Sequence, residues 1–113
     1  GQAPAQAAQT AAVMSSDWYR GFIVHDPAPS IRAATVPILG VYGGRDLQVT
    51  ADQNAAALQA LNPRAEVRVF PEANHLMQPA TTGLPAEYGQ IETTIDPDIV
   101  SFVTDWIARR LGL

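Results

Sequence analysis

The sequence has no cysteine, which excludes disulfide bonds and thiolate metal sites. It has only two histidines, His25 and His75, far apart in the chain and without the paired spacing of a zinc site. We therefore expect no metal and no cofactor, and we interpret His25 as a structural residue. Because a chain without cysteine suits both oxidising and reducing surroundings, the composition assigns no cellular compartment.

Positive charge and long apolar runs are also scarce. Seven basic residues stand against eleven acidic ones, which gives a net charge of -4. No basic cluster provides the electrostatic footprint of a nucleic-acid-binding protein, and the same balance disfavours an anionic membrane surface. No apolar run approaches the ~18 residues that a membrane-spanning helix needs. We therefore expect neither nucleic acid nor membrane as a partner.

What is present is the composition of one small globular domain, 113 residues of which 47% are hydrophobic. Residues 1–14 are rich in Ala and Gln, and we expect a flexible or helical lead-in there, followed by a domain over residues 15–113. The start at Gly-Gln-Ala-Pro, without Met, fits either a cleaved tag or a removed signal.

Apolar patterning and capping residues predict five main elements in the order helix, strand, helix, strand, helix. A short helical turn is expected around Ser30–Ala33, and a long irregular loop over residues 71–95. This order forms a βαβα unit with two parallel strands, so the predicted fold class is α/β. The expected ranges of the five elements are Ser15–Val24, Val36–Tyr42, Thr50–Leu61, Ala65–Phe70 and Asp96–Gly112.

Local signals support these ranges and predict which side chains are buried. Ser16 or Asp17 is expected to cap the first helix, and Thr50-x-x-Gln53 has the pattern of a capping box. The Val36–Tyr42 run is almost wholly apolar, which is typical of a strand covered on both faces. Four aromatic side chains are expected in the core rather than at a ligand site: Trp18, Phe22, Phe102 and Trp106.

A candidate catalytic residue lies in the loop after each of the two predicted strands. Asp46 lies in Gly-Gly-Arg-Asp-Leu-Gln-Val, and His75 lies in Glu-Ala-Asn-His-Leu-Met-Gln. Loops that leave the carboxyl ends of parallel strands converge on one crevice, and neighbouring strands lie about 4.8 Å apart. We therefore expect Asp46 to reach the imidazole of His75, fix its tautomer through Nδ1–H and leave Nε2 free as a general base.

The same residues also have structural interpretations. Asp46 can serve only as a turn former, and His75 can be an exposed or locally hydrogen-bonded loop residue. Asn74 and Met77 can line a pocket or hold the histidine loop in place. Glu72 is a distant alternative to Asp46 as the acidic partner.

Four segments in register resemble the C-terminal part of the α/β-hydrolase family, in its esterase- and peptidase-like branch. They are the strand and loop ending in Gly-Gly-Arg-Asp46, the loop Pro-Glu-Ala-Asn-His75, the approach His25–Ile31, and Pro85–Gly89. The resemblance covers roughly Asp17 to the C-terminus. It implies a partial α/β-hydrolase fold, Asp46 as catalytic acid, His75 as catalytic histidine, and hydrolysis of an ester, amide or thioester. It identifies no substrate-binding residue.

The nucleophile of that family is absent from the sequence. The family carries its serine on a Gly-x-Ser-x-Gly elbow, upstream of the acid and the histidine. Without that serine and the upstream oxyanion hole, His75 has no proton to take. We therefore expect a C-terminal fragment of a serine hydrolase, inactive alone, whose serine comes from missing sequence or another polypeptide. The serines present, none in such a motif, are Ser15, Ser16, Ser30 and Ser101.

A second interpretation is a non-catalytic interaction module derived from a hydrolase. A βαβα piece leaves one side of the Val36–Tyr42 strand without a neighbour and leaves helix faces uncovered. We therefore expect a homodimer or higher oligomer, formed through an intersubunit sheet or through swapped helices. A third interpretation is that this chain complements a separately encoded chain, which supplies the N-terminal half of the fold.

Overall fold

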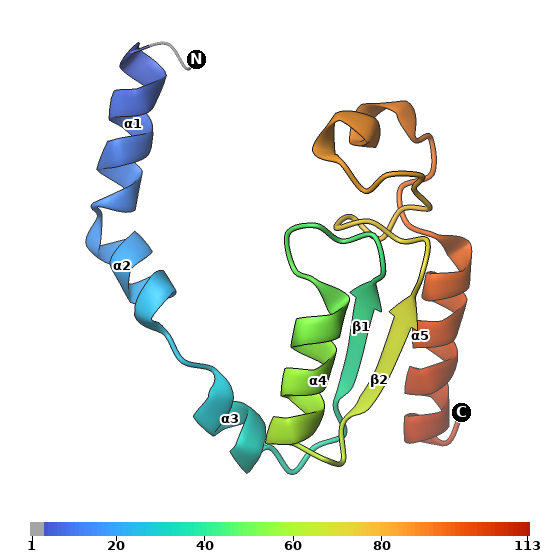
Figure 1. Ribbon diagram of the computed structural model, residues 1–113. Coiled ribbons are helices and arrows are strands. Elements are labelled where there is room, and N and C mark those ends of the chain that lie inside the picture. The colour runs from blue at the N-terminus through green and yellow to red at the C-terminus, as the bar shows by residue number, and fades with distance from the viewer. Residues whose placement is uncertain (1–3) are drawn as a thin grey trace. The chain divides into compact units, whose positions relative to one another are not determined.

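The computed structural model describes residues 4–113 and divides the chain into two compact units. The first ends at Ala33 and the second spans Ala34–Leu113 (Figure 1). The division thus falls later in the chain than the expected end of the lead-in at residue 14. Residues 1–3 of the expected lead-in lie outside the described residues, and the predicted domain limits stay a prediction.

The first unit consists of three helices, α1 (Pro4–Met14), α2 (Asp17–Val24) and α3 (Ala28–Ala33). The lead-in is helical over all of its described residues, because alanine and glutamine are strong helix formers. The predicted start of α2 is confirmed, since the Ser16 hydroxyl accepts the backbone N–H of Tyr19 at 3.2 Å.

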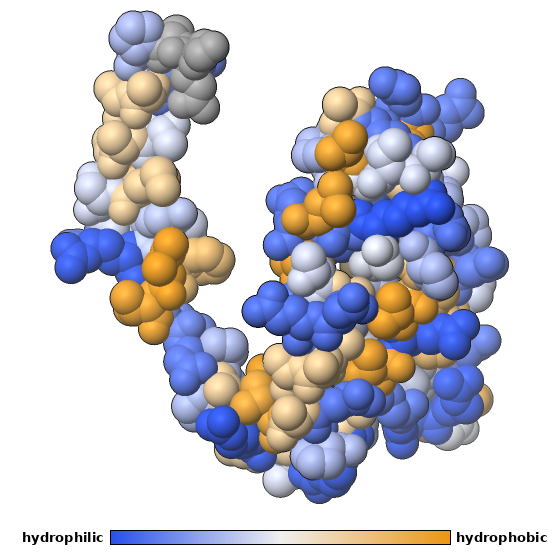
Figure 2. All heavy atoms as spheres, in the orientation of Figure 1, coloured by the Kyte–Doolittle hydropathy of each residue, from blue (hydrophilic) through white to orange (hydrophobic). Residues whose placement is uncertain are grey.

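The prediction that Trp18 and Phe22 lie in the core is wrong. Their exposed fractions are 72% and 69%, and their rings stack on each other with centroids 6.0 Å apart. Ile23 and Val24 are exposed as well, and Figure 2 shows apolar atoms, in orange, at the surface of this unit. None of the three helices of the first unit has a buried residue, so the apolar face of α2 has no core to join.

The second unit is an α/β arrangement around a two-stranded parallel sheet. The sheet pairs β1 (Leu39–Gly43) with β2 (Glu66–Phe70) over their full lengths. The connecting helix α4 (Ala51–Leu61) packs on one face of the sheet, and α5 (Pro97–Leu111) lies on the other (Figure 1). A 3-10 helix, η1 (Pro85–Gln90), stands between β2 and α5. The predicted order and parallel pairing are thus confirmed.

Neighbouring residues of β1 face the two helices that cover the sheet in turn. A Cβ at Gly40 would lie 2.5 Å from a methyl carbon of Leu58 on α4, whereas the neighbouring Val41 lines a groove with residues of α5. On the α5 side, the rings of Phe70 and Phe102 meet edge to face with centroids 5.7 Å apart. The small core of the second unit therefore lies in two layers, one on each face of the sheet.

Two expectations for β1 and α4 are wrong. β1 begins at Leu39 instead of Val36. Helices lie on both of its faces as expected, but only its two glycines are buried. A central strand needs neighbours on both edges, and the described sheet has one neighbour for β1. Thr50 precedes α4 as predicted, but its side chain makes no capping hydrogen bond. The capping box with Gln53 is therefore not formed.

The last helix agrees with its prediction most closely. The Asp96 side chain accepts the backbone N–H of Asp98 at 2.9 Å, and Gly112 ends α5 with a left-handed φ of 71°. Ile99 is buried, whereas Phe102 and Trp106, which were expected in the core, are half-buried. No helix within residues 4–113 is long and apolar enough to cross a membrane. The segment of residues 71–95, expected to be an irregular loop, contains the 3-10 helix η1.

Candidate functional site

The loops that follow β1 and β2 are joined by backbone hydrogen bonds at the carboxyl edge of the sheet. The N–H of Gly44 donates to the carbonyl of Phe70 at 2.8 Å, and the N–H of Arg45 donates to the carbonyl of Ala73 at 2.9 Å. A Cβ at Gly43 would lie 2.4 Å from the Ala73 carbonyl oxygen. Only glycine allows so close an approach of the two backbones, which brings the loops of the predicted site residues together.

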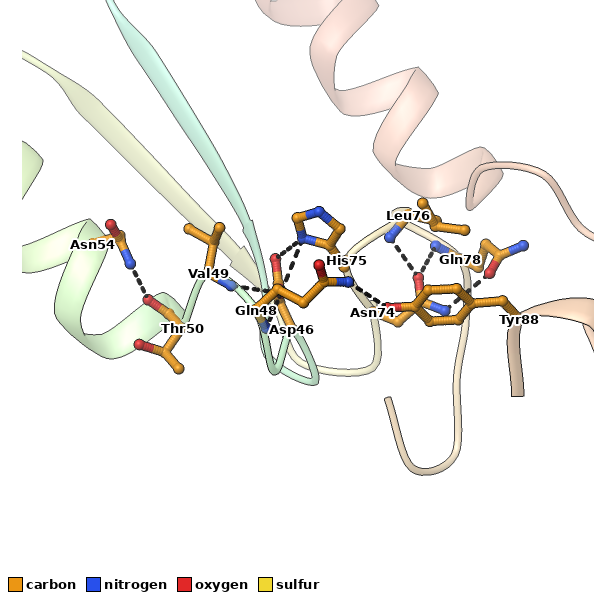
Figure 3. Close-up of polar contacts among 10 residues, drawn as sticks. All are labelled: Asp46, Gln48, Val49, Thr50, Asn54, Asn74, His75, Leu76, Gln78 and Tyr88. Carbon is orange, nitrogen blue, oxygen red and sulfur yellow. Dashed lines mark hydrogen bonds and ion pairs between the residues drawn. The ribbon is translucent and has the colours of Figure 1, made fainter. Parts of the chain in front are cut away.

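Asp46 and His75 meet across these two loops (Figure 3). The Nδ1 atom of His75 lies 3.1 Å from Oδ1 and 3.0 Å from Oδ2 of Asp46. Asp46 is 6% exposed, and its Oδ1 also accepts the N–H groups of Gln48 and Val49 at 2.9 Å each. The predicted contact is present; the predicted catalytic role of the two residues stays a prediction.

The surroundings of Asp46 keep it ionised. Burial by itself would raise the pKa of the carboxyl group, but the N–H of Val49, the imidazole of His75 and the N–H of Gln48 together outweigh burial. The pKa of Asp46 is therefore lowered, and the group is a carboxylate at neutral pH. A carboxylate at this place accepts Nδ1–H and leaves Nε2 as the proton-accepting atom of the ring.

The imidazole keeps one side open. The side chain of His75 is 35% exposed, and its second ring nitrogen points away from Asp46 (Figure 3). An imidazole held at Nδ1 and accessible at Nε2 can take a proton from a hydroxyl group or a water molecule. The arrangement is therefore suited to general acid–base chemistry.

Asn74 holds the histidine loop in place. Its side chain is fully buried, its Oδ1 accepts the N–H groups of Leu76 and Gln78 at 2.9 and 3.0 Å, and its Nδ2 donates to Oε1 of Gln78 at 2.9 Å. Gln78 in turn donates to the carbonyl of Thr93 at 3.2 Å. Of the two interpretations of Asn74, the structure supports the one in which it fixes the loop.

The remaining candidates lie away from the imidazole. The carboxylate of Glu72 pairs with the guanidinium of Arg45 rather than with His75. Met77 has a left-handed φ of 58° and lines an apolar groove beside β1 and α5. His25 is an exposed residue of the first unit. No group of three or more metal-ligating side chains occurs among residues 4–113.

The structure adds one residue to the expected site residues, Glu87 of η1, which lies in the segment Pro85–Gly89. Its carboxylate accepts the hydroxyl of Thr82 at 2.7 Å and the N–H groups of Thr81, Thr82 and Gly83 at 2.6, 2.9 and 3.0 Å. These bonds lower the pKa of Glu87 to about 2, and the bond from the Thr82 hydroxyl has the largest effect. The sequence signal was a Thr-Thr-Gly turn followed closely by a glutamate.

Glu87 predicts a pH-dependent contribution to stability. A carboxyl group whose pKa is lowered on folding stabilises the folded protein at any pH above the pKa that the group has in the unfolded chain, about 4.3. This contribution is lost as the pH falls through about 2. We therefore expect Glu87→Gln to destabilise the chain near neutral pH and to differ less from the wild type as the pH approaches 2. Urea unfolding across this range measures the difference. Glu92→Gln, at an exposed glutamate nearby, is the control, and a pH-independent difference would contradict the expectation.

Comparison with known proteins finds one esterase. The chain is 32% identical over 87 residues to Esterase EstD of Thermotoga maritima, an alignment that covers 74% of this chain and 21% of that protein. The chain thus spans about a fifth of the length of the curated relative it matches. No family model and no solved structure matches it. The chain is esterase-like over most of its length, and its two parallel strands and helices are compatible with part of an α/β fold.

Proposed function

We propose that this chain supplies the acid and the histidine of a serine hydrolase site on part of an α/β-hydrolase fold. The observation that carries the proposal is the contact between Asp46 and His75 at the carboxyl ends of two parallel strands. The likeness to an esterase over most of the chain supports the same reaction class. The proposed reaction is hydrolysis of an ester, amide or thioester through an acyl-enzyme.

Each residue has a defined part in this reaction. Nε2 of His75 removes the proton of a serine hydroxyl as the serine oxygen attacks the carbonyl carbon, and then gives that proton to the leaving group. Asp46 keeps the proton on Nδ1 and stabilises the imidazolium that forms. In the second half of the reaction, water gives a proton to Nε2 of His75 and attacks the acyl-enzyme. The proton then returns to the serine oxygen, and the carboxylic acid product is released. The serine and the oxyanion hole come from outside these 113 residues, because no serine here lies on a Gly-x-Ser-x-Gly elbow.

The proposal predicts that the isolated chain neither hydrolyses an activated ester nor reacts with a fluorophosphonate probe. A protein in which this chain replaces the matching part of Esterase EstD, called here the fused protein, is expected to do both. Ester turnover and the mass of the probe adduct measure the two activities, with unaltered Esterase EstD as the positive control. Stoichiometric labelling of the isolated chain that disappears in His75→Ala would contradict an external serine.

A second candidate function is self-association, which the groove beside β1 favours. The groove has a volume of about 360 Å³. β1 carries no charged side chain, whereas β2 carries Glu66 and Arg68, so two β1 edges can pair without bringing like charges together. The occupant that we propose is a second copy of this chain. The groove is lined by Val41, Met77, Ile95, Ile99, Val100, Val103 and Thr104.

Self-association predicts a dimer that a charge in the groove disrupts. Val100 lines the groove, and Ser101 is exposed on the same helix. Sedimentation equilibrium is expected to give a dimer for the wild type and for Ser101→Asp, and a monomer for Val100→Asp, because a buried aspartate has no partner there. A monomeric wild type at tens of micromolar would contradict the dimer.

A further inference from the structure

The segment Ala80–Tyr88 touches the Asp46 loop on both sides of the carboxylate. Before Asp46, the guanidinium of Arg45 donates to the carbonyl of Ala80. After it, Nε2 of Gln48 donates to the hydroxyl of Tyr88 at 3.1 Å (Figure 3). The same Gln48 donates its backbone N–H to Oδ1 of Asp46. The segment is therefore linked to the carboxylate through its two neighbours in the loop.

Gly83 forms the tightest of these contacts. Its φ is +77°, and a Cβ built on it would lie 2.0 Å from the carbonyl oxygen of Arg45. The backbone of the segment therefore lies directly on the residue that precedes Asp46. A side chain at this position would push the segment away from the loop and would also strain the left-handed backbone.

Glu87 is linked to both the contact of Gly83 with Arg45 and the contact of Tyr88 with Gln48. Its carboxylate gathers the N–H groups of residues 81–83, and so fixes the turn that places Gly83 against Arg45. It also precedes Tyr88 directly in η1, so the hydroxyl that Gln48 binds comes from the same short helix. Charge-assisted bonds of this kind are stronger than those between neutral groups, and no other carboxylate is bonded to this turn within residues 4–113.

We propose that Glu87 is a positioning residue for Asp46. By holding Gly83 against Arg45 and Tyr88 against Gln48, it fixes the loop from which the carboxylate meets His75. The catalytic consequence rests on the proposed function, whereas the effect on the geometry belongs to this chain alone. The expected loss is therefore a loss of the single orientation and tautomer of the His75 ring.

The test is the tautomer of His75, read from ¹⁵N chemical shifts of the 113-residue chain at a pH of about 8.5, above the ordinary imidazole range. Signals are assigned by comparison with His75→Gln. The wild type is expected to hold its proton on Nδ1. Glu87→Gln, whose amide offers one acceptor oxygen in place of two, is expected to give a mixture of both tautomers. Glu92→Gln, at an exposed glutamate, is expected to match the wild type.

A second pair of variants changes the contact without touching Glu87. Gly83→Ala is expected to mix the tautomers as Glu87→Gln does, because its Cβ collides with Arg45. Gly89→Ala is the matched control, since nothing lies within 4 Å of a Cβ there. Should either test variant lose its far-UV circular dichroism, Tyr88→Phe, which removes only the hydroxyl that Gln48 binds, is expected to show the same change to a smaller extent.

The outcomes separate this inference from the function on which it rests. Folded variants that melt at a lower temperature and keep the proton on Nδ1 would overturn the positioning role, because Glu87 would then stabilise the segment alone. A wild-type chain with mixed tautomers would instead overturn the proposed function, because Asp46 would then not keep the proton on Nδ1 of His75.

Discussion

Replacing Asp46 with Asn is expected to lower kcat for ester hydrolysis by the fused protein about 10⁴-fold, the loss that the same change causes in a serine protease. The amide keeps the size of the side chain, but its Nδ2 cannot accept Nδ1–H from His75. The ring then favours the other tautomer, which places a proton on the nitrogen that must accept one. Initial rates with an activated ester measure the loss.

The control for this variant is Asp52→Asn, which removes the same charge from an exposed aspartate in the first turn of α4. It is expected to leave kcat within a factor of about two, because surface charges far from the reacting atoms contribute little. A kcat for Asp46→Asn close to that of the wild type would assign Asp46 to the turn alone, through its bonds to Gln48 and Val49.

Replacing Asn74 with Ala is expected to remove most of the stability of the second unit. The change leaves three groups without partners: the buried N–H and Oε1 of Gln78 and the part-buried N–H of Leu76. Each unpaired buried group costs roughly 1–3 kcal/mol. Their sum approaches the total of about 5–15 kcal/mol that a small domain has. Urea unfolding followed by circular dichroism measures the loss.

Two other variants test whether the loss of stability comes from the hydrogen bonds of Asn74. Asn54→Ala removes an amide whose only side-chain bond is a solvent-exposed one to the carbonyl of Thr50, and we expect a change within about 0.5 kcal/mol. Asn74→Asp keeps an acceptor for the two N–H groups but loses the donor to Gln78, so its stability should fall between those of Asn74→Ala and the wild type. A stability of Asn74→Ala equal to that of Asn54→Ala would show that the histidine loop does not depend on this network.

The order of elements and the contact between Asp46 and His75 could be predicted because they depend on features that the sequence displays. Apolar runs and breakers set the alternation of strands and helices. The parallel pairing then places both loops at one edge of the sheet. The caps of α5 are local as well, since Asp96 and Gly112 act on residues within one turn of them.

Burial was harder to predict, because an apolar pattern shows which face of an element can be buried but not whether a partner is present. Trp18 and Phe22 form an apolar face as expected, yet the first unit has no core for them to join. β1 is apolar as expected and has one neighbouring strand among the described residues. Glu87 was missed for another reason, since its bonds depend on the turn at residues 81–83, which has no periodic pattern.

Ester turnover by the fused protein tests whether His75 serves as the general base of an ester hydrolase. In the fused protein this chain provides the histidine, so we expect turnover with the wild-type segment and only background hydrolysis with His75→Ala. Turnover that survives His75→Ala, in a fused protein that remains folded, would show that His75 is not the general base.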